Sequence, residues 1–557
     1  MPLVKNQIIP LTIDALSSDG NGVGRFEGQA VFVPFAAVGD VLSVKVVKIC
    51  KSYAFGIVES VLTPGTGRIP ADCPIFGRCG GCCFRHLSYE AELAAKQGFV
   101  ADALRRIGGL DVPVRDILPS PQTERYRNKV QYPLFLAGDG SVQAGFYASR
   151  SHRPLPCGDC LLQPGLLNRI AATLCALLTQ YHISVYDEQA HRGLARHIYL
   201  RHAVTNGSVL VCLVCNGRSL PHAQDICAAL VKAHPEVESV VLNVNTHKTN
   251  VITGKECITL YGPGVLHDTM RGVPVALGPL SFYQVNTEGA NRLYGVAADF
   301  AAPGPEDTLL DLYCGAGTIG LSMAEHCGRL IGVEIVPEAV ESARRNAAAM
   351  GVEHAEFFCA DAGTAAQKLA ADGLLPNIVV LDPPRKGCDE PTLKAVLAMA
   401  PQRIVMVSCN PATAARDLKY LSQHGYAVQA VQPVDMFPRT KHVETVVLLS
   451  HKKPDGHINV KVEFGEGEGK VPLDNIAKRA EEYKPKERVT YKMIKEYIEA
   501  KYGFKVHTAY IAEVKRDLGL PMYDAPNAVE ELKQPRKHPT AEKVEAIKDA
   551  LKYFGVI

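Results

Sequence analysis

Cys409 and Glu444 are the residues whose types and positions are best suited to covalent catalysis. The apolar run Ile404 to Val407 predicts a buried strand, and Cys409 follows it in a polar loop broken by Pro411. A second apolar run, Val443 to Leu449, carries Glu444. Side chains at the ends of such strands meet substrates. The pair predicts a nucleophilic thiol with a separate acid or base; the alternative is a core cysteine that only packs.

The elements that position this pair repeat a β-α-β pattern. Short apolar strands alternate with helices from Asp307 onwards. This alternation predicts an α/β fold with a doubly wound, largely parallel sheet of Rossmann type. The predicted strands are Thr308–Tyr313, Leu330–Glu334, Glu356–Ala360, Ile378–Asp382 and Ile404–Val407.

A glycine loop follows the first of these strands. Gly315, Gly317 and Gly320 fit the pattern G-x-G-x-x-G, and Glu334 lies nineteen residues after Gly315. Glycines let the backbone approach a ligand closely, and the acid can bind two ribose hydroxyls. This motif alone fits a nicotinamide-dependent oxidoreductase as well as an adenosyl cofactor.

Three further acids favour a cationic cofactor. Asp311 lies in the strand before the glycines, Asp361 at the end of the third strand, and Asp382 at the start of Asp-Pro-Pro-Arg-Lys-Gly387. Acids around a pocket suit a sulfonium better than a pyrophosphate. We therefore expect S-adenosylmethionine rather than NAD, with Asp361 at the adenine edge.

Five motifs now support a resemblance. The sequence resembles the TRAM-domain, iron–sulfur-containing RNA uridine C5-methyltransferases over about residues 1–450. The segments that carry the resemblance are Ser281–Asn286, Asp311–Gly317, Leu381–Gly387, Ser408–Thr413 and Asp435–Glu444.

The resemblance implies roles for individual residues. Cys409 would be the nucleophile and Glu444 the base, in methyl transfer to carbon 5 of a uridine. The expected substrate is 23S ribosomal RNA, with transfer RNA as the alternative. A catalytically idle RNA-binding or assembly factor is a further alternative, and the intact Cys409 and Glu444 speak against it. The implied contacts to the methyl donor are Gln284, Tyr313, Glu334 and Asp382. Cys314 and Cys388 are nearby thiols that could compete with Cys409.

A second group of cysteines precedes this region. Cys73, Cys79 and Cys82 are brought together by a loop with Pro74 and a Gly-Gly pair, and their spacing also suits structural zinc. Iron–sulfur clusters are likewise held by four thiolates. The resemblance implies a four-iron cluster with Cys160 as the fourth ligand, and Cys157 and Cys83 are its rivals. A cluster that joins distant segments is expected to be structural.

The composition bounds the remaining expectations. The chain has 557 residues, 47% of them hydrophobic, and a net charge of +2, so RNA contacts must come from local basic clusters. Neither a signal peptide nor an apolar run near eighteen residues is seen, which predicts a cytoplasmic protein with no membrane contact. We expect a monomer. The candidates for holding RNA are Tyr126–Lys129, Tyr147–His152 and Arg439–Lys441.

The sequence predicts four segments. Residues 1–62 have the short strands and glycine turns of a small TRAM-like β-barrel, residues 63–300 form a central iron–sulfur and RNA-binding domain, and residues 301–450 form the methyltransferase domain. All seventeen cysteines precede residue 451. Residues 451–557 are instead rich in charge and helical in pattern, which predicts an accessory domain of helical or winged-helix type for an RNA or protein contact.

Overall fold

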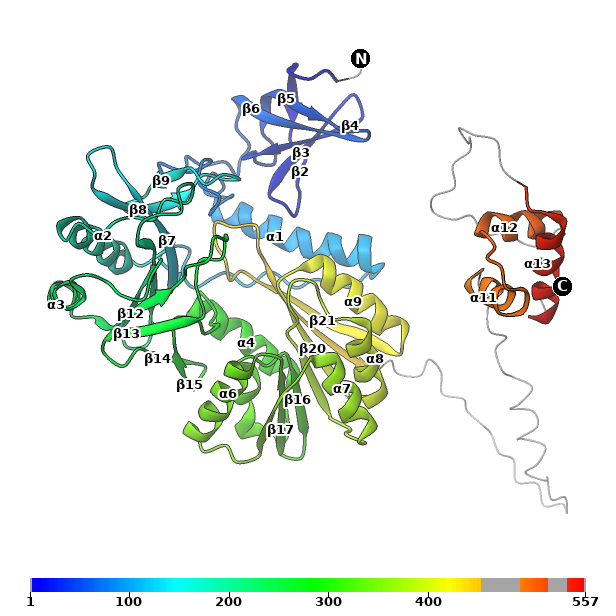
Figure 1. The fold of residues 1–557 in the computed structure, drawn as a ribbon. Helices are drawn as coiled ribbons and strands as arrows, with labels where there is room; N and C mark the ends of the chain where they lie inside the picture. Colours follow the sequence, from blue (N-terminus) through cyan, green and yellow to red (C-terminus); the bar gives the residue numbers. More distant parts are fainter. Residues whose placement is uncertain (1–2, 452–490, 519–537, 555–557) are drawn as a thin grey trace. The chain divides into compact units, whose positions relative to one another are not determined.

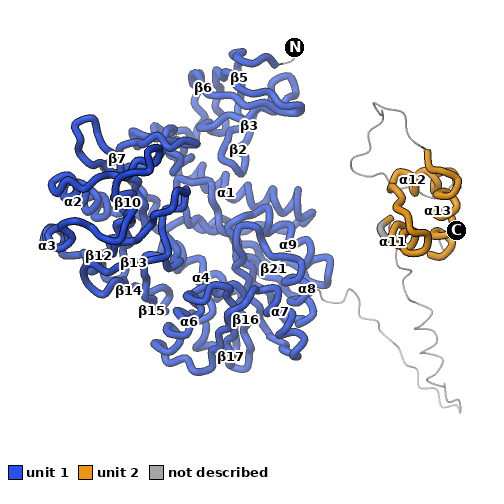
Figure 2. Tube along the Cα trace, in the orientation of Figure 1, with its two compact units in different colours: residues 1–456 blue, residues 457–557 orange. Residues whose placement is uncertain are grey.

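The computed structural model describes residues 3–451, 491–518 and 538–554. They belong to two compact units, 1–456 and 457–557 (Figure 2). Within these described ranges, no helix is both long and apolar enough to cross a membrane.

The chain begins with a six-stranded, curled sheet whose strand order is β1-β5-β6-β4-β3-β2 (Figure 1, blue). Alternate residues of each strand point inward, so that side chains such as Leu11, Val33 and Val44 make a small closed core. The predicted barrel is therefore present. Its strands are β1 (Ile8–Thr12), β2 (Ala15–Leu16), β3 (Asn21–Phe26), β4 (Gln29–Pro34), β5 (Val41–Ile49) and β6 (Tyr53–Thr63).

Helix α1 (Tyr89–Ala103) follows and ends in a π-helical turn, Leu104–Gly108. Ser88 caps its start, where the Oγ accepts a hydrogen bond from the Ala91 N–H at 3.2 Å. The helix packs against α9 (Pro411–Gln423) and against strand β21 (Tyr426–Val434) (Figure 1). An early segment of the chain thus supports elements more than 300 residues later.

The central region contains a seven-stranded sheet in the order β13-β12-β11-β10-β7-β8-β9. Helices α2 (Gly165–Gln180) and α3 (Ala223–Ala233) cover one face. The other face shares a core with residues 290–446. A hairpin of β14 (Leu266–Met270) and β15 (Val273–Leu277) completes the region. The sheet strands are β7 (Lys129–Leu136), β8 (Val142–Tyr147), β9 (Pro154–Pro156), β10 (Ala195–His202), β11 (Val209–Cys215), β12 (Val237–Val244) and β13 (Glu256–Tyr261).

A second seven-stranded sheet, formed by residues 308–451, has the order β18-β17-β16-β19-β20-β22-β21. The first five strands are parallel, and β22 runs antiparallel to both of its neighbours. The strands are β16 (Thr308–Leu312), β17 (Arg329–Glu334), β18 (Ala355–Cys359), β19 (Ile378–Leu381), β20 (Arg403–Ser408), β21 (Tyr426–Val434) and β22 (Glu444–His451).

Helices bury both faces of this sheet, which is why its central strands are apolar without alternation. Leu309, Val380 and Val405 face α4 (Thr287–Ala301) and α6 (Pro337–Ala349). Leu310 and Val379 face the opposite layer. That layer consists of α1, α7 (Ala362–Ala371), α8 (Glu390–Met399) and α9.

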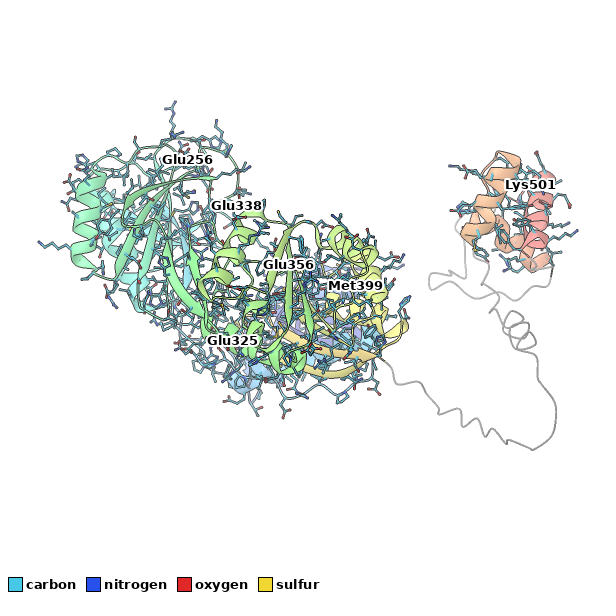
Figure 3. The ribbon with its side chains drawn as sticks, turned by 90° about the horizontal axis from the view of Figure 1, so that it is seen from below. Glu256, Glu325, Glu338, Glu356, Met399 and Lys501 are labelled. Atoms are coloured by element: carbon cyan, nitrogen blue, oxygen red, sulfur yellow. The ribbon has the colours of Figure 1, made fainter. Side chains whose placement is uncertain are left out.

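The described part of the second unit is helical, as predicted. It contains α11 (Tyr491–Tyr502), α12 (Thr508–Asp517) and α13 (Ala541–Tyr553), around a core that includes Ile498, Ile511 and Ile547. Lys501 on α11 donates a hydrogen bond to Asp549 on α13 at 2.8 Å (Figure 3). No strand occurs among the residues described in this unit, so a winged-helix wing is not part of them.

Candidate active site

The nucleophile and base candidates meet because one strand of the sheet is reversed. Parallel strands bring their carboxyl ends to one edge, and the antiparallel β22 begins at that edge. Ser408, the last residue of β20, pairs with Thr445, so Cys409 and Glu444 are the next residues on each strand. The structure therefore places the two predicted catalytic groups at adjoining strand ends.

Cys409 lies at the start of a helix rather than in an extended loop. Helix α9 begins at Pro411, and Asn410 caps it by accepting a hydrogen bond from the Ala412 N–H at 3.1 Å. Proline is favourable at this first helical position because its missing N–H would have no helical partner. The thiol is half-buried. Burial raises its pKa to about 11, the Glu444 carboxylate adds to the rise, and the Arg385 guanidinium opposes it.

Glu444 belongs to a group of buried acids. Burial, with repulsion from Asp382, raises the pKa of Glu444 to about 8. Burial raises the pKa of Asp382 to about 7 and that of Asp311 to about 8. A site in which each carboxylate is held above its ordinary pKa favours a bound cation.

The glycine loop has one strained turn and one open position. Tyr313, Gly315 and Gly317 have φ values of 68°, 56° and 79°, in the left-handed region that glycine adopts most readily. The Gly315 N–H donates to the Glu334 carboxylate at 3.1 Å. No atom lies within 4 Å of where a Gly315 Cβ would stand, so the loop leaves space for a ligand.

Asp311 supplies a test of whether a methyl donor fits. Its Oδ2 accepts a hydrogen bond from the Gly320 N–H at 2.9 Å, while its Oδ1 is buried without a partner among the described residues. An unpaired buried carboxylate oxygen is costly unless a ligand donates to it. The ammonium group of S-adenosylmethionine is a donor of the right charge.

The other residues that were predicted to contact the methyl donor differ in their surroundings. The Gln284 amide donates to the Tyr294 hydroxyl at 3.3 Å, and the pKa of Tyr294 is raised by burial and by Asp382. The Tyr313 hydroxyl lies 3.4 Å from Thr392 Oγ1 on α8. Asp361 caps α7 by accepting from the Thr364 N–H at 3.1 Å. Gln284 thus contacts Tyr294, which lies near Asp382. Asp361 has a structural role as well, because it caps α7.

Sequence reasoning missed two residues that the fold brings to the acidic site. Tyr294 projects from α4 with no motif around it beyond helical periodicity. His442 lies within a quoted motif, but nothing in the sequence showed that its Nε2 lies 3.5 Å from Arg385 Nη2. Only the three-dimensional arrangement of β19, β20 and β22 reveals that contact.

A fully buried lysine holds the segment before Glu444. Lys96 on α1 donates to Glu92 at 2.7 Å, to Asp435 at 2.7 Å and to the Phe437 carbonyl at 3.0 Å. Glu92 also accepts from the Arg439 N–H at 2.7 Å. This Lys96 network fixes the chain that leads to the base.

One side chain in each of two candidate RNA-holding groups, Tyr126 and Arg439, turns inward. Tyr126 is buried, and its hydroxyl donates to the Pro438 carbonyl at 2.9 Å, so its ring cannot stack on a base. Arg439 lies against Tyr89 and donates to the Leu87 carbonyl at 3.2 Å. The expectation that Tyr126 and Arg439 hold RNA is therefore wrong, because an aromatic or basic residue type does not reveal whether the side chain is buried. Lys441 is partly exposed and pairs with Asp19 of the barrel at 2.7 Å.

The cysteine group is gathered but not arranged as a ready metal site. Among the described residues, no set of three or more Cys, His, Asp or Glu side chains is placed to hold a metal ion. The thiols of Cys79 and Cys82 nevertheless lie close enough to Cys160 for each to be affected by its charge. Cys157 interacts directly with Cys160, whereas Cys83 packs beside a separate apolar cluster. Of the two rivals, Cys157 contacts Cys160, whereas Cys83 is near Cys82.

Comparison with known proteins agrees with these features. Residues 88–452 match the family described as tRNA (uracil-5-)-methyltransferase, and residues 2–58 match the TRAM domain. An uncharacterized RNA methyltransferase of Halalkalibacterium halodurans is 42% identical over 452 residues, which cover 81% of this chain and 98% of the relative. A counterpart in Clostridium tetani is 39% identical over 451 residues, with the same coverage of both chains.

A solved structure also matches. The Pyrococcus abyssi tRNA (uracil-54, C5)-methyltransferase, in complex with S-adenosyl-L-homocysteine, is 27% identical with a TM-score of 0.64. The match covers 79% of this chain and 99% of that chain. The predicted fold class and the resemblance are confirmed by these matches. The iron–sulfur expectation is not tested by them.

Proposed function

The chain belongs to the tRNA (uracil-5-)-methyltransferase family, and from this premise we propose that it methylates carbon 5 of a uridine in 23S ribosomal RNA. The methyl donor is S-adenosylmethionine, which supplies an electrophilic methyl group. The observation that carries the proposal is the meeting of Cys409 and Glu444 at adjoining strand ends. Transfer RNA is the second candidate substrate, because the solved relative acts on it.

The two side chains match the two needs of the reaction. Carbon 5 of uracil is a weak nucleophile, so the Cys409 thiolate first adds to carbon 6 and the electron pair moves to the ring as an enolate. Carbon 5 then attacks the methyl carbon, and the electron pair of the broken carbon–sulfur bond leaves on the sulfur of S-adenosylhomocysteine. Glu444 removes the proton from carbon 5, and the returning electron pair expels the Cys409 thiolate. The enzyme is regenerated once Glu444 has released this proton to solvent.

The remaining residues bind and position. We propose that the unpaired Asp311 oxygen and the Gly315 turn hold the methyl donor, with Gln284, Tyr313, Glu334, Asp361 and Asp382 around it. The target base must leave its stack to reach Cys409, which costs a few kcal/mol and favours a looped site.

We also propose that Cys73, Cys79, Cys82 and Cys160 hold a structural four-iron cluster. The four soft thiols suit iron–sulfur ligation. Burial raises the pKa of Cys82 to about 11, and the Arg85 guanidinium opposes this rise. Quantification of iron and acid-labile sulfide after anaerobic purification tests this. Stoichiometric zinc without sulfide would refute it.

The test of function uses labelled methyl donor with unmodified 23S ribosomal RNA and with unmodified transfer RNA. We expect label at carbon 5 of a uridine in the ribosomal RNA, and none with Cys409→Ala. Label only in transfer RNA would support the second candidate. Label in neither RNA would refute both.

A further inference from the structure

Arg385 connects the loop of the nucleophile to the segment of the base. Its carbonyl accepts hydrogen bonds from Asn410 Nδ2 at 3.0 Å and from Thr413 Oγ1 at 3.3 Å, on either side of the start of α9. Its guanidinium Nη2 lies 3.5 Å from His442 Nε2, two residues before Glu444. Arg385 is therefore held at its backbone by the loop of the nucleophile and at its guanidinium by His442, between the groups proposed to form and resolve the covalent bond.

Cys409 needs a cation because its surroundings oppose the thiolate. Burial, Glu444 and Asp382 each raise the pKa of the thiol. The nearby Arg385 guanidinium opposes them and lowers the pKa of the thiol. An arginine side chain has several rotatable bonds, so its guanidinium must be held in place if it is to stay beside the thiol.

His442 is placed to provide that fixation. Its ring meets Phe437 edge to face, with centroids 6.1 Å apart, and its backbone N–H donates to Thr440 Oγ1 at 3.3 Å. Burial lowers the pKa of His442 to about 4, and the cations Arg385, Lys441, Lys96 and Arg127 add to this. The imidazole is therefore neutral at physiological pH, and an unprotonated Nε2 can accept the N–H of Arg385.

We propose that His442 is a positioning residue that holds the Arg385 guanidinium against the Cys409 thiol by accepting its hydrogen bond. The inference rests on the nucleophilic role of Cys409 in the proposed function. In this arrangement the residue two places before the base tunes the nucleophile.

The experiment measures the reactivity of Cys409 itself, without RNA. The full chain is treated with iodoacetamide from pH 6 to 10, and alkylation of the Cys409 peptide is followed by mass spectrometry. Cys359, which is exposed, is the internal reference. Because the readout needs no substrate, it separates failure of this inference from failure of the proposed function.

We expect His442→Phe to slow Cys409 alkylation about tenfold at pH 8, the loss expected for one charge-assisted hydrogen bond. Arg385→Met should slow it similarly, and the double variant should be no slower than either single variant. His442→Gln keeps an acceptor and should restore most of the rate, which covers the case in which His442→Phe does not fold. His424→Phe, at an exposed position, should have no effect.

Two results would overturn the inference. Unchanged Cys409 alkylation in a folded His442→Phe protein would show that the ring does not act through Arg385. If His442→Phe slowed Cys409 alkylation by the same factor in the wild type and in the Arg385→Met variant, His442 would act on the thiol directly.

Discussion

Replacement of Glu444 by glutamine separates formation of the covalent bond from its resolution. Glutamine keeps the size of the side chain but cannot take the proton from carbon 5. Since the thiolate leaves only after that proton has gone, we expect methylated RNA to remain attached to Cys409. The base contributes about 10²- to 10⁴-fold in such reactions, so turnover should fall by that factor.

The same change should make the thiol more reactive. Directly opposed residues on antiparallel strands have Cβ atoms about 5 Å apart. Two unit charges at that separation, with an effective dielectric of about 20, repel by about 3 kcal/mol. That energy corresponds to about two pKa units. Loss of the Glu444 charge should therefore lower the pKa of Cys409 by up to this amount above pH 8, where Glu444 is ionised.

The assay incubates the variant with RNA and labelled methyl donor and resolves the products under denaturing conditions. We expect a protein–RNA adduct that carries label and withstands denaturation. Glu356→Gln is the matched control, because Glu356 is an exposed glutamate on the far edge strand β18 of the same sheet (Figure 3). The control should turn over like the wild type.

Release of free methylated RNA by Glu444→Gln at the wild-type rate would remove Glu444 from the role of base. A slower alkylation of Cys409 in the variant than in the wild type would contradict the electrostatic part of the reasoning.

Three further predictions concern stability and binding. Burial raises the pKa of Asp382 from its ordinary value of 3.8 to about 7. Between these two pH values the folded state keeps a proton on Asp382 that the unfolded state has lost. The free energy of unfolding therefore falls as pH rises through that window. Asp382→Asn should therefore raise the Tm at pH 8 but not at pH 3, and equal shifts at both would refute this. Lys96→Met should cost about 3–5 kcal/mol in urea unfolding by removing the buried ammonium that pairs with both Glu92 and Asp435, whereas the exposed Lys394→Met should change little. Asp311→Asn should weaken S-adenosylhomocysteine binding about tenfold or more in calorimetry, and unchanged affinity would show that the unpaired oxygen does not meet the ligand.

Much of the fold could be predicted because its signals are local. The apolar strands ending at Leu312, Leu381 and Ser408 are buried on both faces, so their composition alone marks them. The glycine loop and Asn410-Pro411 likewise carry their own backbone chemistry. Such features depend on neighbours in sequence. The strands and the glycine loop lie where they were expected, whereas Pro411 begins helix α9 instead of breaking a loop.

The contacts that could not be predicted join distant segments. A lysine four residues after a glutamate on a helix usually indicates a solvated pair, yet Lys96 is fully buried against Asp435, 339 residues away. Tyr126 has the composition of a stacking residue, but its ring lies in the core. Burial depends on what the rest of the chain brings to a residue, and spacing does not contain that information.

The reversed strand β22 also sets the order in which the enzyme becomes competent during synthesis. Strands β20 and β21 are made before β22, which inserts between them and carries Glu444. A nascent chain made only as far as β21 has the proposed nucleophile but lacks the proposed base. On the proposed mechanism, such an intermediate has no group with which to release a captured uridine. Turnover would therefore begin only when β22 fills the gap between β20 and the edge strand β21, so the strand made last also completes the proposed chemistry.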